Sequence, residues 1–374
     1  MGKSLVATLR LAAAACTAAA SCCALAGPLD RSIVDPGAIW LVHVDVDAAK
    51  LSPVGEQTLA RMTTERHSPL ARMECELGIS PAKDIKSLTV FAVPATMSDG
   101  IVIFTTSDAA DHLGEHLSKA NPKSYRAEKS PQGVPVHVWR TRRGEMRAAV
   151  YPGRRDGERL LVMADTTDEL ETGINALTSR SNGPTPGIMP AAEPREGSIV
   201  FFTCGDLNSQ PGQQPPSAAI LQASRSLVLD IGQTPASTPA RMYGQAVMNT
   251  DDAASAVKVQ QMAQGILALL TTPREGAAAS PPAEEAALMQ EMIKNVSIIT
   301  DDRRCLVASD HDSQVFARVI DLVMQKNAAA AKARHEAMRE RGPGDPAGGP
   351  PSRRQRPEGE SRDAAGGPGK GGRP

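Results

Sequence analysis

The sequence predicts an α+β fold: a tandem duplication of a sheet-plus-helices module, with an N-terminal signal peptide and a disordered C-terminal tail. Short alternating or apolar runs, typical of strands, are followed by capped amphipathic stretches, typical of helices. Four such segments recur in the same order in both halves of the chain. Residues 342–374 are rich in Gly, Pro and Arg, without apolar periodicity, and cannot bury a core.

The first 26 residues have the pattern of a cleaved signal peptide. Lys3 and Arg10 precede or begin an Ala-rich apolar stretch, and Ala24-Leu25-Ala26 supplies the small residues of a cleavage site. The stretch is too short for a membrane span, which needs about 20 strongly apolar residues. We therefore expect cleavage near Ala26, a periplasmic or extracellular location, and no transmembrane segment in the mature chain.

The remaining boundaries follow from changes in composition along the chain. A Pro- and Gly-rich stretch without periodicity separates the two modules as a linker. The predicted segments are the signal peptide (1–26), a lead segment (27–37), module 1 (38–180), the linker (181–196), module 2 (197–326), a helical extension (327–341) and the tail (342–374).

Module 1 opens with an alternating run over residues 39–46 that predicts a strand. Two helices should follow. The second begins at Ser68-Pro69, a cap residue with proline at the first helical position, and ends at Gly78. A further strand is predicted over residues 87–93.

The rest of module 1 alternates strands with one helix and then ends on another. A strand over residues 101–105 leads to a cap near Ser107 and a helix to about residue 120. Residues 142–145 should join two strands of a hairpin. The last strand leads into a helix whose first turn carries a T-x-x-E capping box, Thr166 and Glu169.

Module 2 repeats these patterns in order. Each pair shares the same succession of apolar strand, polar or acidic cap and helix. The matching segments are 37–47 with 197–207, 87–93 with 226–232, 100–117 with 241–270, and 158–180 with 303–325.

This arrangement resembles that of uncharacterised exported bacterial proteins built from paired α+β modules, each ending in strand, cap and helix. The resemblance covers roughly Ala38 to Gln325. It implies the duplicated fold. Because that family carries no assigned activity, the resemblance implies no substrate or cofactor for this chain.

Cysteine use does not indicate a disulfide framework. Cys16 or Cys22 in the leader could carry a lipid, but the residues before Cys22 lack the leucine of a lipobox, which argues against an anchor. Cys75, Cys204 and Cys305 remain in the mature chain, an odd number at wide spacing. We expect three small buried side chains, although one pair among them could form.

No motif for catalysis is present in the sequence. There is no G-x-S-x-G elbow, Walker A loop, C-x-x-C pair, or G-x-G-x-x-G after a strand. The formal net charge of -1 gives no global field to attract nucleic acid or an anionic membrane. We expect no enzyme, no cofactor and no nucleic-acid partner.

The best constellation for chemistry is His43, Asp45 and Asp47. Alternation along a strand would place all three on one face, where a histidine and two carboxylates could bind Zn²⁺ or Mn²⁺. The competing interpretation is a solvent-facing polar strand face on which Asp47 caps the next helix. No distant fourth ligand is evident.

Two other polar clusters invite a metal interpretation. His112 and His116 have the spacing of zinc ligands on a helix, but the glutamate stands beside the second histidine and not the first, so the zincin motif is absent. The acidic stretches 251–252 and 310–313 lack the spacing of an EF-hand loop. We expect a solvated helix face in the first case and helix caps in the second.

Together these observations predict a non-enzymatic interaction or scaffold protein of the bacterial cell envelope. Its partner could be an envelope protein or polymer, and its oligomeric state is left open. The alternative is a protein that binds a metal or small ligand through the face bearing His43, Asp45 and Asp47.

Overall fold

The computed structural model describes residues 29–64, 69–94, 100–141, 144–179, 189–207, 219–234, 237, 239–271 and 283–340. The predicted signal peptide (1–26) and tail (342–374) lie outside the described residues. The chain divides into two compact units, Met1–Val323 and Met324–Pro374. The sheet described below lies in the first of them.

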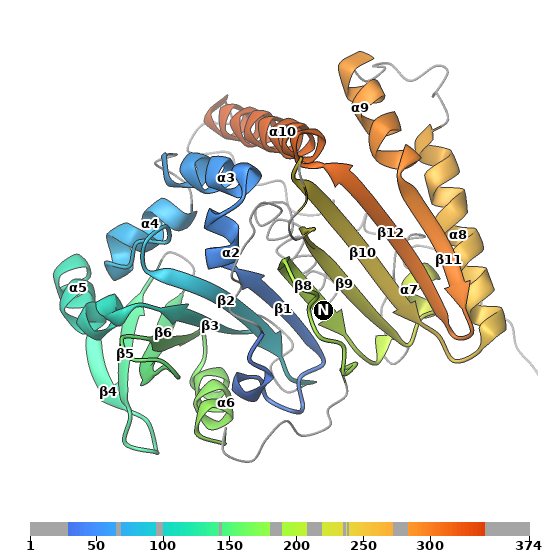
Figure 1. Ribbon diagram of the computed structural model, residues 1–374. Coiled ribbons are helices and arrows are strands. Elements are labelled where there is room, and N and C mark those ends of the chain that lie inside the picture. The colour runs from blue at the N-terminus through green and yellow to red at the C-terminus, as the bar shows by residue number, and fades with distance from the viewer. Residues whose placement is uncertain are drawn as a thin grey trace, which may run out of the picture. The chain divides into compact units, whose positions relative to one another are not determined.

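All the described strands form one antiparallel sheet, in the order β11-β12-β10-β9-β8-β1-β2-β3-β7-β6-β5-β4 (Figure 1). The predicted α+β class is thus confirmed. The strands are β1 (Trp40–Asp45), β2 (Ile85–Ala92), β3 (Ile101–Thr106), β4 (Arg126–Lys129), β5 (Pro135–Arg140), β6 (Glu145–Pro152), β7 (Arg159–Ala164), β8 (Ser198–Cys204), β9 (Ser226–Gln233), β10 (Arg241–Asn249), β11 (Val296–Asp301) and β12 (Arg304–Asp312).

The helices begin and end at the local signals that the sequence carries. Ser107 and Thr166 cap the helices that follow them, the latter in the predicted capping box with Glu169. Gly78, with φ of 70°, follows the last residue of α4. The helices are η1 (Arg31–Ile33), α2 (Val46–Lys50), α3 (Pro53–Thr64), α4 (Pro69–Leu77), η3 (Asp108–His112), α5 (Leu113–Ala120), α6 (Thr167–Thr178), α7 (Ala219–Gln222), α8 (Ala253–Thr271), α9 (Ala283–Lys294) and α10 (Ser313–Glu340).

From the centre of the sheet outward, the two halves have the same strand order. One half runs β1-β2-β3-β7-β6 and the other β8-β9-β10-β12-β11. β1 and β8 pair antiparallel with Val42 opposite Phe202, and these two residues hold corresponding positions in the predicted repeat. This strand order is the one that the predicted repeat requires. That the repeat arose by duplication remains a prediction. β5 and β4 extend the first half alone.

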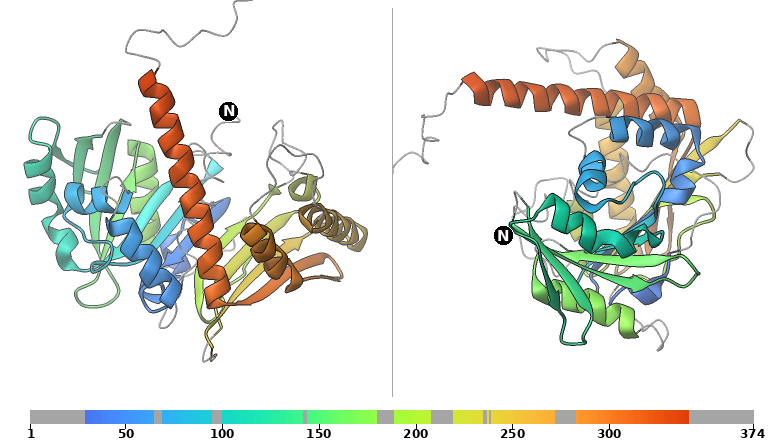
Figure 2. Two further views of the ribbon diagram at one scale, coloured as in Figure 1. Left: turned by 90° about the horizontal axis from the view of Figure 1, so that it is seen from above. Right: turned by 90° about the vertical axis from the view of Figure 1, so that its left-hand side faces the viewer.

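The sheet has two faces, which the packing distinguishes. We call the face that carries Leu41 and Phe201 face A, and the face that carries Trp40 and Val200 face B. Face B packs against α2, α3, α4, α5, α8 and the start of α10. Face A packs against α6 and η1 over the first half. Figure 2 (right) shows α5 and α6 on opposite sides of the first-half strands.

Candidate interaction surface on the second half of the sheet

In the first half, α6 closes face A. A row of three apolar side chains crosses β3, β7 and β6, namely Ile103, Val162 and Ala149, which stand opposite one another in register. All three are 0% exposed and belong to the cluster that α6 completes. The backbone of α6 approaches closely: a Cβ on Gly173 would lie only 2.7 Å from Cγ1 of Val162. This row is the buried seat of a helix.

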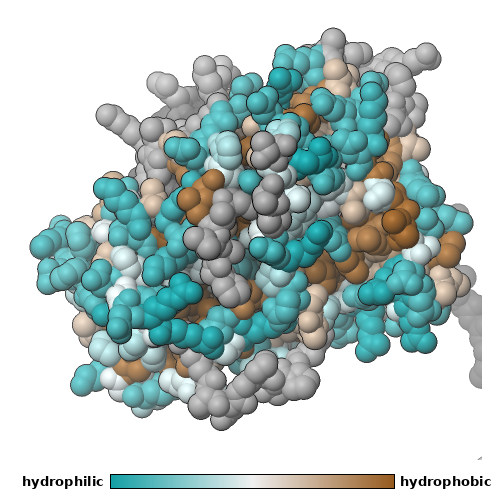
Figure 3. All heavy atoms as spheres, in the orientation of Figure 1, coloured by the Kyte–Doolittle hydropathy of each residue, from teal (hydrophilic) through white to brown (hydrophobic). Residues whose placement is uncertain are grey.

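Positions in the two halves can be matched by the register of the strands, counted outward from β1 and β8. By this count, the second half has Val247, Leu306 and Ile299 at the corresponding positions. Val247 stands opposite Leu306, and Leu306 opposite Ile299, on β10, β12 and β11. Ile299 is 54% exposed, and Val247 and Leu306 are half-buried. We call these three side chains the open row; its inner member, Val247, also packs against the edge of the cluster that α6 completes. Apolar atoms gather over the same strands on the molecular surface (Figure 3).

The open row is left open because the second half sends its helices to face B. Ile220 of α7, Val259 of α8 and Phe316 of α10 pack with face-B residues of these strands, including Met248 and Met242. In Figure 1, β11 lies in front of α8, which packs on face B. α6 therefore has no counterpart on face A among the described helices that contact these strands.

The last strand also differs in length between the two halves. β7 ends at Ala164, and α6 starts at Thr167 after a short turn. In β12 the corresponding residue is Ala308, but the strand continues to Asp312 in register with Arg241. The chain then enters α10, where Phe316 packs beside Met242 on face B.

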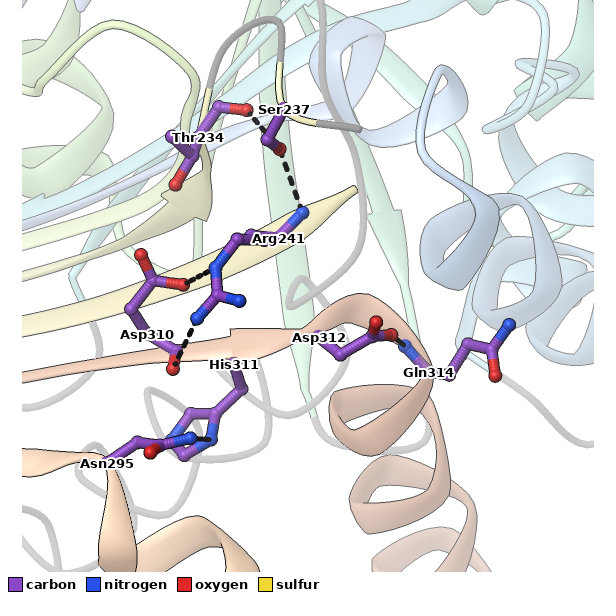
Figure 4. Close-up of polar contacts among 8 residues, drawn as sticks. All are labelled: Thr234, Ser237, Arg241, Asn295, Asp310, His311, Asp312 and Gln314. Atoms are coloured by element: carbon purple, nitrogen blue, oxygen red, sulfur yellow. Dashed lines mark hydrogen bonds and ion pairs between the residues drawn. The ribbon is translucent and has the colours of Figure 1, made fainter. Parts of the chain in front are cut away.

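Ion pairs border the open row at both ends of the strands. Arg241 Nε lies 2.6 Å from Asp310 Oδ1, and Arg304 Nη2 lies 2.6 Å from Asp301 Oδ2. Figure 4 shows the first pair, with the main-chain N–H of Arg241 donating to Ser237 Oγ at 3.0 Å. An apolar centre with a polar, solvent-exposed rim is the usual anatomy of a protein-binding surface.

A buried carboxylate anchors the side of this surface nearest the centre of the sheet. Asp230 on β9 accepts the main-chain N–H of Arg195 at 3.0 Å and the hydroxyl of Tyr243 at 3.3 Å. The guanidinium of Arg195 lies 4.6 Å from the centre of the Tyr243 ring and donates to Gln245 at 3.0 Å. Burial raises the pKa of Asp230, because desolvation outweighs these hydrogen bonds.

The raised pKa predicts a pH-dependent stability. At pH values between its unfolded and folded pKa values, Asp230 binds more protons in the native state than in the unfolded state. Its contribution to the free energy of unfolding is therefore present below the unfolded pKa. That contribution is lost as pH rises through the folded pKa. Asp230→Asn should remove this decline. Urea unfolding at several pH values from about 3 to 7 measures it, with the exposed Asp301→Asn as control. Parallel pH profiles for wild type and Asp230→Asn would contradict the assignment.

The structure changes the interpretation of the His43, Asp45 and Asp47 triplet. His43 is buried, with Nδ1 2.9 Å from Thr89 Oγ1. Asp45 is also buried and accepts the N–H of Ala48 as the N-cap of α2, so β1 ends there. Asp47 therefore belongs to α2 and pairs with Lys50.

The expectation that all three side chains share one strand face is wrong, because the strand ends at Asp45. The competing interpretation of a solvent-facing strand face is also wrong, because His43 and Asp45 are buried. The expectation that Asp47 caps the helix is also wrong, since Asp45 does so. In the part of the chain that the structure describes, no three His, Cys, Asp or Glu side chains are grouped so that they could hold a metal ion.

The other polar clusters cap or flank helices. His112 ends η3 and His116 lies in α5, both exposed, while Leu113 and Leu117 are buried, as a solvated helix face requires. Two carboxylates cap the helices that follow them: Asp252 accepts the N–H of Ser255, and Asp312 that of Gln314. The capping interpretation is confirmed at these two residues.

Two details near these clusters differ from expectation or extend it. Cys204 and Cys305 are buried, but Cys75 is exposed on α4, so the prediction of a buried side chain is wrong for Cys75. All three are free thiols.

Beside the α10 cap, His311 lies buried on face B, with Nδ1 3.4 Å from Asn295 Nδ2 (Figure 4). Burial lowers the pKa of His311.

The open row is not evident from the sequence. Its three residues come from three strands, and their alignment depends on pairing across the sheet. The sequence repeat does not mark it: the segments 100–117 and 241–270 differ in length, and the match of 158–180 with 303–325 aligns Val162 with Val307, one residue from Leu306.

Comparison with protein-family models finds no match, and neither does comparison with curated proteins. The predicted resemblance to exported proteins with paired modules therefore remains a prediction. Among solved structures, the chain is similar to crystal form I of TP0453, with a TM-score of 0.40 and 12% identity over 80% of this chain and 98% of that one. A similarity at this level carries no inference about fold or function. None of the described helices is long and apolar enough to cross a membrane.

Proposed function

We propose that this chain is an exported, non-enzymatic interaction protein of the bacterial cell envelope that holds a protein partner on the open row. The observation that carries the proposal is the contrast between corresponding rows. Ile103, Val162 and Ala149 are fully buried, whereas Ile299 in the second row is 54% exposed. The predicted signal peptide supports the envelope as the place of binding.

The physical argument is that apolar side chains on a sheet face are stabilised by a covering layer. Removing apolar surface from water contributes about 25 cal/mol per Å². The open row and its ion-paired rim offer that gain to a partner, while the sheet beneath is held by ladders on both sides of β10 and β12. Binding of this kind needs no catalytic group.

Site-specific photo-cross-linking in cells tests the proposal. A benzophenone amino acid at position 299 should give light-dependent adducts with an envelope protein. The matched control is position 269, because Leu269 is an exposed apolar residue on α8, 74% exposed and outside the open row. Adducts from 299 that are absent from 269 support the proposal. Equal adducts from both positions, or none from 299, overturn it.

A further inference from the structure

We infer that the open row is a seat for an amphipathic helix supplied by the partner, laid on face A as α6 is laid on the first half. This inference rests on the proposed function and names the chemistry of the element that is bound. The argument comes from the chain itself, because its first half shows what covers the corresponding three positions.

The residues of α6 define what such a helix must present. Leu170, Ile174 and Leu177 form its buried stripe, at the i, i+4, i+7 spacing of one helix face. Between them Gly173 meets the sheet directly, and a Cβ there would lie 2.9 Å from Ile101 and closer still to Val162. A helix seated on this face thus needs three large apolar side chains and a small residue at the point of closest approach.

The second half alters this seat in ways that specify the partner further. Leu306 replaces Val162 and Ile299 replaces Ala149, so the row is bulkier and makes a small residue in the incoming helix more important. Toward the centre of the sheet, register places Gln245 and Asp230 where the first half has Ile101 and Phe91. Gln245 is only half-buried and is held by Arg195, so that side of the seat is polar.

The rim also selects for charge. Arg241 with Asp310 and Arg304 with Asp301 place one cation and one anion on each side of the row, toward the two ends of the strands. A helix whose apolar stripe is flanked by both acidic and basic side chains can meet these exposed pairs without burying an unpaired charge. The partner element is therefore an amphipathic helix of about three turns with mixed charges on its flanks.

The peptide of α6 itself probes the apolar part of this seat; its charged residues are all acidic (Asp168, Glu169 and Glu171), so it does not test the preference for mixed charges. Residues 166–179, made as a peptide with a hydrocarbon staple joining positions 168 and 172, are titrated into the chain from Gly27 onward with methyl-labelled Ile, Leu and Val. We expect saturable shifts at Val247, Leu306 and Ile299, and none at Ile103 and Val162, which α6 already covers. Stapling limits the cost of ordering a short helix.

Two substitutions make the test specific. Ile299→Glu should weaken peptide binding at least about tenfold, a loss of about 1.4 kcal/mol, while Leu269→Glu should leave it unchanged. A peptide carrying Ile174→Asp should not bind. The unfolding midpoint of each protein variant is measured beside wild type, so that a folding defect is not mistaken for a binding defect.

The outcomes separate this inference from the proposed function. Cross-linking from position 299 without any peptide shift at the open row would keep the interaction surface and overturn the helical partner. Peptide shifts at the open row without cross-links in cells would support a helix seat and overturn the envelope function. Shifts that Ile299→Glu leaves unchanged would place the peptide elsewhere and overturn the inference.

Discussion

Phe201→Ala is expected to lower the free energy of unfolding by about 3–5 kcal/mol, the usual loss for a buried phenylalanine. Phe201 is 0% exposed and stands in β8 between His43 on β1 and Asp230 on β9. It belongs to the cluster that contains Leu41 from the first half and Val228 from the second. The cavity would therefore form where the two halves meet, in a sheet whose ladders prevent the strands from closing it.

Denaturant unfolding followed by tryptophan fluorescence measures this loss. Both tryptophans, Trp40 and Trp139, lie in the first half, whereas Phe201 belongs to the second. A shift of the fluorescence midpoint in Phe201→Ala shows that a side chain of the second half stabilises the first half. Phe202→Ala is the control, because this neighbour on face B is only partly buried and should cost less. An unchanged midpoint in Phe201→Ala would mean that the two halves unfold separately.

The local elements could be predicted because their signals are local. The capping box of Thr166 and Glu169 is complete within four residues, and alternating runs identified β1, β2 and β9 within a few residues of their bounds. β11 was missed: its run from Val296 follows α9 without a glycine or proline to separate them. Short apolar runs next to helices are ambiguous by periodicity alone.

The environment of the side chains could not be predicted in the same way. Alternation correctly placed His43 and Asp45 on one face, but not whether that face was covered. A polar face is expected in water, and here it lies beside Thr89 in the buried centre of a sheet that spans both modules. The exposure of Ile299 also could not be predicted from local patterns, because it depends on which face of the sheet α10 packs against after β12. These are properties of tertiary packing.

Gly232→Ala is the second substitution with a large expected effect. A Cβ at this position would overlap the main-chain oxygen of Gly197 and lie 2.6 Å from the hydroxyl oxygen of Tyr243. Neither can move freely: Gln233 donates its N–H to that same Gly197 oxygen at 3.0 Å, and Tyr243 donates to the buried Asp230. Overpacking of this kind costs about 1–3 kcal/mol, occasionally more.

The comparison with Gly244→Ala tests whether the backbone is the cause. A Cβ on Gly244 would meet only Ser309 Oγ, at 3.1 Å, and a serine side chain can rotate away, so its loss should be below about 1 kcal/mol. Urea unfolding of both variants gives the two values. If Gly232→Ala also displaces Tyr243, Asp230 loses a hydrogen bond while still buried, and the loss should grow as pH rises and the carboxylate ionises. Equal, pH-independent losses for the two glycines would show that the contact around Asp230 relaxes easily and does not hold this side of the surface in place.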